Sequence, residues 1–139
     1  MNTSNAELEN SKINIKFKLM GLWITLMLLY IYADLFSFYR PGYISEVIAG
    51  FIGPLSVNQI TLAASSVLML IPAFMIIVCL FIKANALRWI NIVIGALYTL
   101  VGIGNLAGEV WVYYLMYGIA EIFITITIMI LAFKWPRRE

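Results

Sequence analysis

Residues 110–139 read VWVYYLMYGIAEIFITITIMILAFKWPRRE, an apolar run over 110–133 followed by a basic segment over 134–139. A helix rises about 1.5 Å per residue, so this run is long enough to cross a hydrocarbon core of roughly 30 Å. Its apolar residues are continuous and do not alternate with period two, which favours a helix over a barrel strand. The stretch therefore predicts a transmembrane helix.

Three further apolar runs, over 19–38, 59–82 and 88–106, have the same character. The chain is 63% hydrophobic and only 12% charged, which is far outside the range of soluble domains. We therefore predict an all-α fold, an integral membrane four-helix bundle over 19–134 whose surroundings are the lipid bilayer. Polar tails are expected over 1–18 and 135–139.

The connections between these runs differ in length and composition. Ser45 is a candidate N-cap for a short helix through Phe51, and Gly53-Pro54 then interrupts it. We expect a short outer-face helix or a re-entrant loop between helices one and two. Pro72 should kink helix two. A short connector over 83–87 leads to helix three, whose Gly95, Gly102 and Gly104, with Gly108 beyond, predict close helix packing.

The basic residues are distributed very unequally along the chain. Of nine Lys and Arg residues, only Arg40 falls on one side of the predicted bundle. The others share the opposite side: Lys12, Lys16, Lys18, Lys83, Arg88, Lys134, Arg137 and Arg138. The positive-inside rule places this side, and both termini, in the cytoplasm. So strong a bias also disfavours the antiparallel dimer of dual-topology small multidrug exporters.

Two carboxyl groups fall where lipid should be. Glu121 lies roughly 16 Å from the outer end of helix four, close to the bilayer midplane, and Asp34 lies roughly 6 Å from the outer end of helix one. A charge near the bilayer centre costs at least about 2.5 to 3.5 kcal/mol, so such acids are candidates for function.

Tyrosines and asparagines recur at helical spacing around these acids and should meet them inside the bundle. The outer half is therefore expected to hold a wet, tyrosine-lined cavity with Glu121 at its floor. The candidate ligand or proton site consists of Glu121, Asp34, Asn105, Tyr117, Tyr98, Tyr30 and Arg40.

Structural roles compete with this interpretation. Glu121 can share its proton with a tyrosine, and Asn91 and Asn105 can join helices. Arg40 can pair with Asp34, Glu46 or Glu109, or can bind an anionic headgroup or substrate. The tyrosines can equally belong to the core of the bundle.

Several functional classes are disfavoured. Cys79 is the only cysteine, so no disulfide or dithiol relay forms within one chain, and the absence of histidine argues against haem, copper or zinc chemistry. The net charge of +2 does not suggest nucleic acid as a partner. No catalytic residue, metal ligand or cofactor motif is predicted, and an enzyme is the least favoured class.

Two functions fit the pattern. One is binding or transport of a small amphipathic molecule, a lipid or a proton through an outer-facing cavity within the bundle, with a small lipophilic ligand as partner. The alternative is a structural or accessory subunit of a membrane complex, with another membrane protein or a second copy as partner.

Short motifs along the chain carry a resemblance: Tyr32-Ala33-Asp34, Pro41-Gly42, Ile71-Pro72, Asn85, Arg88-Trp89-Ile90-Asn91 and Glu121. Over roughly 20–135, the chain resembles a domain-of-unknown-function family of small prokaryotic four-helix membrane proteins. The resemblance implies a prokaryotic inner (cytoplasmic) membrane and supplies no activity. An acid commonly precedes the Ile-Pro pair in that family, where this chain has Leu70.

Overall fold

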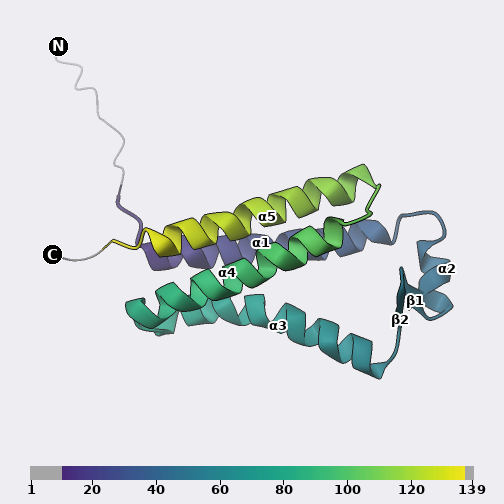
Figure 1. Cartoon of the computed structure of the whole chain (residues 1–139), viewed down its shortest axis with the longest axis horizontal. Coiled ribbons are helices and arrows are strands. Elements are labelled where there is room, and N and C mark those ends of the chain that lie inside the picture. The colour runs from purple at the N-terminus through teal and green to yellow at the C-terminus, as the bar shows by residue number, and fades with distance from the viewer. Residues whose placement is uncertain (1–10, 137–139) are drawn as a thin grey trace, which may run out of the picture.

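The computed structural model describes residues 11–136, and Figure 1 shows them as a bundle of long helices with a small cap at one end. The elements in chain order are α1 (Ile15–Ser37), α2 (Tyr43–Ile48), β1 (Phe51–Ile52), β2 (Leu55–Ser56), α3 (Gln59–Phe81), α4 (Ala84–Leu106) and α5 (Val112–Phe133). The predicted helical bundle is confirmed, with a small strand pair added to it.

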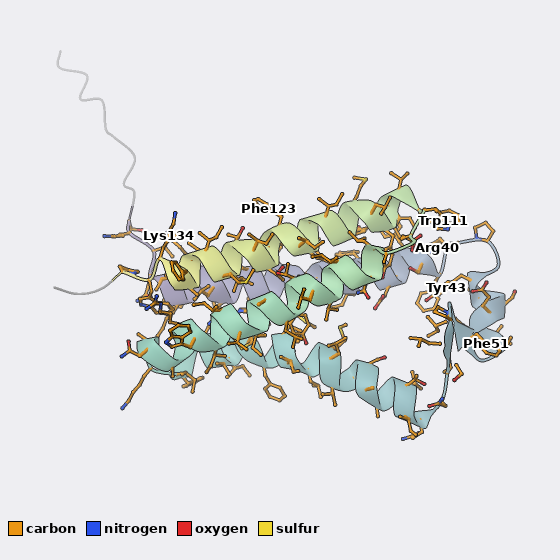
Figure 2. The ribbon with its side chains drawn as sticks, viewed as in Figure 1. Arg40, Tyr43, Phe51, Trp111, Phe123 and Lys134 are labelled. Carbon is orange, nitrogen blue, oxygen red and sulfur yellow. The ribbon has the colours of Figure 1, made fainter. Side chains whose placement is uncertain are left out.

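The four long helices α1, α3, α4 and α5 are each long and apolar enough to cross a membrane. Their outward surfaces carry many large apolar side chains, such as Phe123 of α5, which points away from the bundle in Figure 2. Lipid is the solvent that suits such a surface. The chain thus has the composition and the helix lengths of a multi-pass membrane protein.

The bundle has two chemically different ends. One end carries α2, the β1–β2 hairpin and the α4–α5 connection, and we call it the hairpin end (Figure 1). The other end carries the start of α1 and the end of α5, and we call it the terminal end. Lys16 donates hydrogen bonds there to the carbonyls of Leu80 (3.3 Å) and Ile82 (2.8 Å), so it joins the start of α1 to the end of α3.

The long helices pack unequally. The most extensive contact is between α4 and α5, and α1 packs against both α3 and α5. By contrast, α3 barely contacts α4, and Figure 1 shows the two helices moving apart toward the hairpin end. Within Gln59–Val67 every residue except Thr61 is exposed, whereas Pro72, Met75 and Cys79 of the second half are buried. Only the second half of α3 belongs to the core.

Glycines allow α4 and α5 to approach closely. A Cβ atom on Gly95 would lie 2.8 Å from Cγ of Met129, and one on Gly118 would overlap the side chain of Leu106. The predicted close packing is therefore present at Gly95. It is absent at Gly104 and Gly108, where a Cβ atom would meet nothing within 4 Å, because Gly104 is exposed and Gly108 is in the connection with a φ of 83°.

The element boundaries differ from those predicted in several places. Asn14 caps α1, which begins at Ile15, four residues before the predicted start at 19. The helix α4 begins at Ala84, so the predicted connector over 83–87 is mostly helix. Residues 1–10 of the first predicted tail and residues 137–139 of the second lie outside the described residues. Gly42, with a φ of 85°, precedes α2 in place of the predicted Ser45 cap. After α2 the chain forms the hairpin, which the sequence interpretation missed.

Candidate functional site

The buried polar residues divide into those with hydrogen bonds and one without. Among residues 11–136 the buried polar or charged side chains are Ser37, Asn91, Glu121 and Thr125. The hydroxyl group of Ser37 donates to the carbonyl of Ala33, and that of Thr125 to the carbonyl of Ile122, each at 3.0 Å. Glu121, which is only 5% exposed, has no hydrogen bond or ion pair with any described residue.

Asn91 shows what a structural polar residue looks like in this bundle. Its Oδ1 accepts a hydrogen bond of 2.8 Å from Nε1 of Trp23, and its Nδ2 donates to the carbonyl of Leu87 at 2.9 Å. The Trp23 ring in turn packs edge-on against Tyr98. Asn91 therefore joins α4 to α1, which is the helix-joining role considered for it from the sequence.

The hydroxyl group of Tyr30 is a further buried polar group without a partner, as is Nε of Arg88 on α4. Its side chain is 7% exposed, and its hydroxyl group is fully buried without a hydrogen bond. The hydroxyl group is close enough to interact electrostatically with the carboxyl group of Glu121 and with Tyr114. Two groups that normally form hydrogen bonds thus lie near each other, one from α1 and one from α5, and both remain unsatisfied.

Asp34 connects these groups to the surface. It interacts electrostatically with both Glu121 and Tyr114, and it is exposed. It has no ion pair within residues 11–136, so Asp34 is not the partner that Arg40 takes among the three considered from the sequence. We call Asp34, Tyr114, Tyr30 and Glu121 the polar row. The row runs from the hairpin end of α1 and α5 to the middle of the bundle.

A pocket of about 260 Å³ lies at the hairpin end of the polar row. Its lining comes from α1, α2, the hairpin, the α4–α5 connection and α5: Asp34, Ser37, Arg40, Tyr43, Ile52, Gly53, Pro54, Glu109 and Tyr114. Figure 2 shows Arg40, Tyr43 and Trp111 at this end, with Lys134 at the other. Asp34 and Tyr114 belong both to the pocket and to the polar row, so the two are continuous.

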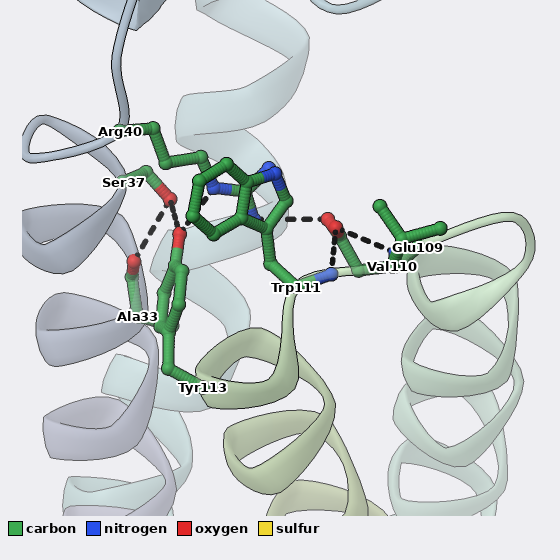
Figure 3. Close-up of polar contacts among 7 residues, drawn as sticks. All are labelled: Ala33, Ser37, Arg40, Glu109, Val110, Trp111 and Tyr113. Atoms are coloured by element: carbon green, nitrogen blue, oxygen red, sulfur yellow. Dashed lines mark hydrogen bonds and ion pairs between the residues drawn. The ribbon is translucent and has the colours of Figure 1, made fainter.

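Arg40 is held by a cluster of side chains beside this pocket (Figure 3). Its Nη2 forms an ion pair of 2.9 Å with Oε2 of Glu109, and its Nε donates to the hydroxyl group of Tyr113 at 2.5 Å. The hydroxyl group of Ser37 donates its proton to the carbonyl of Ala33 and therefore acts as the acceptor toward Tyr113. The hydroxyl group of Tyr113 donates to Ser37 at 3.0 Å. We call Ser37, Arg40, Glu109, Trp111 and Tyr113 the Arg40 cluster.

The cluster also fixes the start of α5. Oε1 of Glu109 accepts hydrogen bonds from the backbone amides of Val110 (2.9 Å) and Trp111 (3.0 Å), and a carboxylate is favourable at a helix N-terminus. The guanidinium carbon of Arg40 lies 5.3 Å from the Trp111 ring centroid and 5.1 Å from that of Tyr113. Glu109 was one of three predicted partners for Arg40, and the structure selects it.

The electrostatics of the cluster strengthen this pairing. Partial burial acts to raise the pKa of the Glu109 carboxyl group, but the hydrogen bonds from the Trp111 amide and from Arg40 outweigh it, so the pKa is lowered. For Arg40, burial acts to lower the pKa, yet the bonds to Glu109 and Tyr113 raise it overall. Burial raises the pKa of Tyr43, which faces the same pocket. Both members of the ion pair remain charged.

Tyr98 has a role that follows from the proline in α3. Residue 72 would normally donate its backbone N–H to the carbonyl of Leu68, four residues earlier, but Pro72 has no N–H group. The hydroxyl group of Tyr98 on α4 donates a hydrogen bond to this carbonyl. Tyr98, predicted as a ligand contact, therefore satisfies the backbone of its neighbouring helix.

The remaining predicted site residues lie apart from the polar row. Tyr117 packs against Phe36, with ring centroids 6.2 Å apart, and lines a groove of about 380 Å³ between α1 and α5. Asn105 is exposed and has no hydrogen bond with a described residue. Of the seven predicted residues, the structure brings Asp34, Tyr30 and Glu121 together and places Arg40 beside the pocket that adjoins them.

Three residues near the site were not selected from the sequence. Tyr113 accepts a hydrogen bond from Arg40, and Ser37 is joined to Arg40 through the hydroxyl group of Tyr113. Tyr114 lines the pocket and lies within electrostatic range of Glu121. Tyr114 has a detectable signal, because it precedes Glu121 by two helical turns. Tyr113 has none, since its partner comes from a loop far away in the chain. Within residues 11–136, no group of three His, Cys, Asp or Glu residues could hold a metal ion.

Comparison with known proteins gives the family and no activity. A search of curated proteins and a search of solved structures each found no match to the chain. The model of a family described as "Family of unknown function (DUF6326)" matches residues 8–139, which include every described element. The chain therefore belongs to the DUF6326 family of unknown function.

Proposed function

We propose that the chain binds a small amphipathic molecule, a lipid or a proton at Glu121 and carries it to or from the hairpin end. The observation that supports this most is the lack of any hydrogen bond or ion pair to Glu121 from a described residue, although it is buried in the middle of α5. An ionised carboxylate in the interior of a membrane is costly, so this acid needs a proton or a bound group to stabilise it.

A purely structural acid should resemble the other buried polar groups. Asn91, Ser37 and Thr125 are each hydrogen-bonded to a neighbour, as groups that join helices must be. Glu121 instead lies within electrostatic range of Tyr30, whose hydroxyl group is unsatisfied, and of Asp34 and Tyr114, which line the hairpin-end pocket. A continuous polar path from a pocket to an intramembrane acid is the arrangement that proton and ligand pathways require.

The proposal includes an orientation. The described Lys and Arg residues other than Arg40 gather at the terminal end, so the positive-inside rule places that end in the cytoplasm of a prokaryotic inner membrane and the hairpin end outside. In a Cys79→Ala background, a membrane-impermeant maleimide should label Ser45→Cys on intact cells but label Lys134→Cys only after lysis. Labelling in the reverse pattern would refute the orientation.

Infrared spectroscopy of the reconstituted protein tests the site itself. A Glu121 carboxyl group that is open to the hairpin end should give a carboxylic-acid band on acidification, and this band should shift promptly in D₂O. Glu121→Gln should remove the band, whereas Glu46→Gln, which removes an exposed acid of α2, should keep it. If the band of wild type does not exchange in D₂O, the acid is sealed off and the proposal fails.

A structural or accessory subunit is the second candidate, and the first half of α3 favours it. Residues 59–67 expose Ala63, Ala64, Ser65 and Ser66 without packing against another long helix. Small residues of this kind allow a partner helix to approach closely. This function predicts that the protein copurifies with another membrane protein or a second copy, and that Glu121→Gln leaves the infrared exchange of the remaining carboxyl groups and the complex unchanged.

A further inference from the structure

The charge balance of the polar row is one-sided. Asp34 and Glu121 both contribute a carboxyl group, and no cationic side chain from residues 11–136 pairs with either. Arg40 is the nearest candidate, but it is engaged by Glu109 and Tyr113 and is stacked among aromatic rings. A ligand of this row therefore has to bring the positive charge itself, because an unpaired ionised carboxylate inside the bundle is costly.

The unsatisfied hydroxyl group of Tyr30 adds a second requirement. Its oxygen is fully buried and accepts no hydrogen bond, and Glu121, which lies within electrostatic range on α5, accepts none either. A ligand that carries N–H donors would satisfy both oxygens, whereas a cation without N–H groups would satisfy only the charge. The rings of Tyr30 and Tyr114 supply faces that also attract cations.

The first half of α3 presents exposed apolar side chains that the rest of such a ligand can contact. Among the described residues, no hydrogen bond joins residues 59–67 to another long helix. Of the hydrogen bonds between α3 and α4, the one from Tyr98 to Leu68 lies nearest to the hairpin end. Leu62 and Val67 are exposed there. An apolar body can thus remain in lipid beside the exposed side chains of the bundle while its charged group enters from the hairpin end, where the pocket meets the polar row.

We propose that the polar row binds the ammonium group of a lipophilic amine, that is, a protonated amine on a small apolar body. This rests on the proposed function and specifies its ligand. The ammonium group donates hydrogen bonds to Glu121 and Tyr30, and Asp34 attracts it from the hairpin end. When Glu121 is protonated beforehand, the amine replaces that proton: the O–H bond of the acid breaks, the proton leaves to water, and the carboxylate pairs with the ammonium ion.

Competition between proton and amine has a defined direction. The groups facing Glu121 are Asp34 and Tyr30 of α1 and Tyr114 of its own helix, while α4 contributes Tyr98 near Tyr30 and α3 contributes no charged group. None of these supplies a positive charge. Amine binding should therefore tighten as the pH rises, as long as the amine stays protonated, and in weak buffer it should release protons.

Titration calorimetry with a matched set of probes tests the assignment. Phenethylammonium should bind at least about tenfold more tightly than 2-phenylethanol, which has a similar body without charge, and 3-phenylpropionate should not bind. Phenyltrimethylammonium, which has no N–H group, should bind more weakly than phenethylammonium. Equal affinity for the amine and the alcohol, or equal or tighter binding of the trimethylated probe, would overturn the proposal.

Variants connect the binding to the polar row. Glu121→Gln and Asp34→Asn should each weaken phenethylammonium binding by about tenfold or more, while Glu46→Gln should leave it unchanged. Circular dichroism and gel filtration confirm that each variant is folded. An unchanged affinity in Glu121→Gln refutes the amine site. If the Glu121 carboxyl group exchanges in the infrared test but phenethylammonium shows no preference, the proposed function stands and this inference alone is wrong.

Discussion

Nε1 of Trp23 donates a hydrogen bond of 2.8 Å to Oδ1 of Asn91, and both side chains are completely buried. This bond links α1 to α4, two helices whose backbones make little direct contact, since α1 packs against α3 and α5 and α4 packs mainly against α5. Two long polar side chains thus join helices that face each other across the bundle. The bond is the feature that most clearly separates structural polar groups from the polar row.

Asn91→Ala should destabilise the bundle by about 1 kcal/mol, because it leaves the indole N–H of Trp23 buried without an acceptor. Unfolding in a mixed detergent titration, followed by tryptophan fluorescence, measures the change. Asn105→Ala is the matched control, since Asn105 is exposed on the same helix and should give no change. Equal effects of the two substitutions would contradict the structural role of Asn91.

Tyr98→Phe should also cost about 1 kcal/mol, because the carbonyl of Leu68 loses the hydroxyl donor that replaces the missing N–H of Pro72. In a Pro72→Ala background residue 72 regains its N–H group, so Tyr98→Phe should then cost much less. A double-mutant cycle on the free energy of unfolding measures this coupling. Additive effects would show that the hydroxyl group and the proline act independently.

The Arg40 cluster should weaken in acid. The pKa of Glu109 is lowered in the folded chain, mainly by the bonds from Trp111 and Arg40 acting against burial, so its stabilisation is present above the unfolded pKa and is lost as the pH falls through the folded pKa. The protection factors of the Val110 and Trp111 amides against hydrogen exchange, taken relative to the intrinsic rate at each pH, should fall over that acidic range. In Glu109→Gln these amides should exchange faster already at neutral pH, and the acid dependence should disappear.

Gly95→Val should destabilise the α4–α5 contact by about 1 to 3 kcal/mol, because the added side chain meets Met129 and the backbone of Thr125. Gly104→Val tests the same residue change on the same helix where nothing lies within 4 Å of the new Cβ atom, and it should be tolerated. Thermal unfolding of both variants in one detergent gives the comparison. If the two variants lose the same stability, helix propensity rather than packing determines the cost.

The sequence predicts the four long helices because each apolar run is continuous and as long as a bilayer is thick. It could not predict the hairpin, since Phe51–Ile52 and Leu55–Ser56 are too short to show a strand pattern and depend on the turn residues between them. Likewise, Glu121 and Asp34 are detectable as acids inside apolar runs. Which tyrosines and asparagines lie near these acids depends on how the helices are rotated about their axes. The sequence therefore could not show that Tyr30 joins the polar row while Tyr117 and Asn105 do not.

The arrangement of Arg40 shows the same limit at shorter range. Charge alone allows it to pair with Asp34, Glu46 or Glu109. The choice of Glu109 depends on the α4–α5 connection reaching the end of α1, where Tyr113 and Trp111 enclose the guanidinium group. That choice leaves Asp34 without a cation, and the one-sided charge of the polar row follows from it.

The pairing of Pro72 with Tyr98 also imposes an order on any redesign of this chain. While the proline is present, loss of the hydroxyl group at position 98 leaves a carbonyl of α3 unsatisfied. Replacing the proline first restores a backbone N–H group, so position 98 can then be changed at lower cost. Two positions on different helices and far apart in the chain should therefore be substituted in that order.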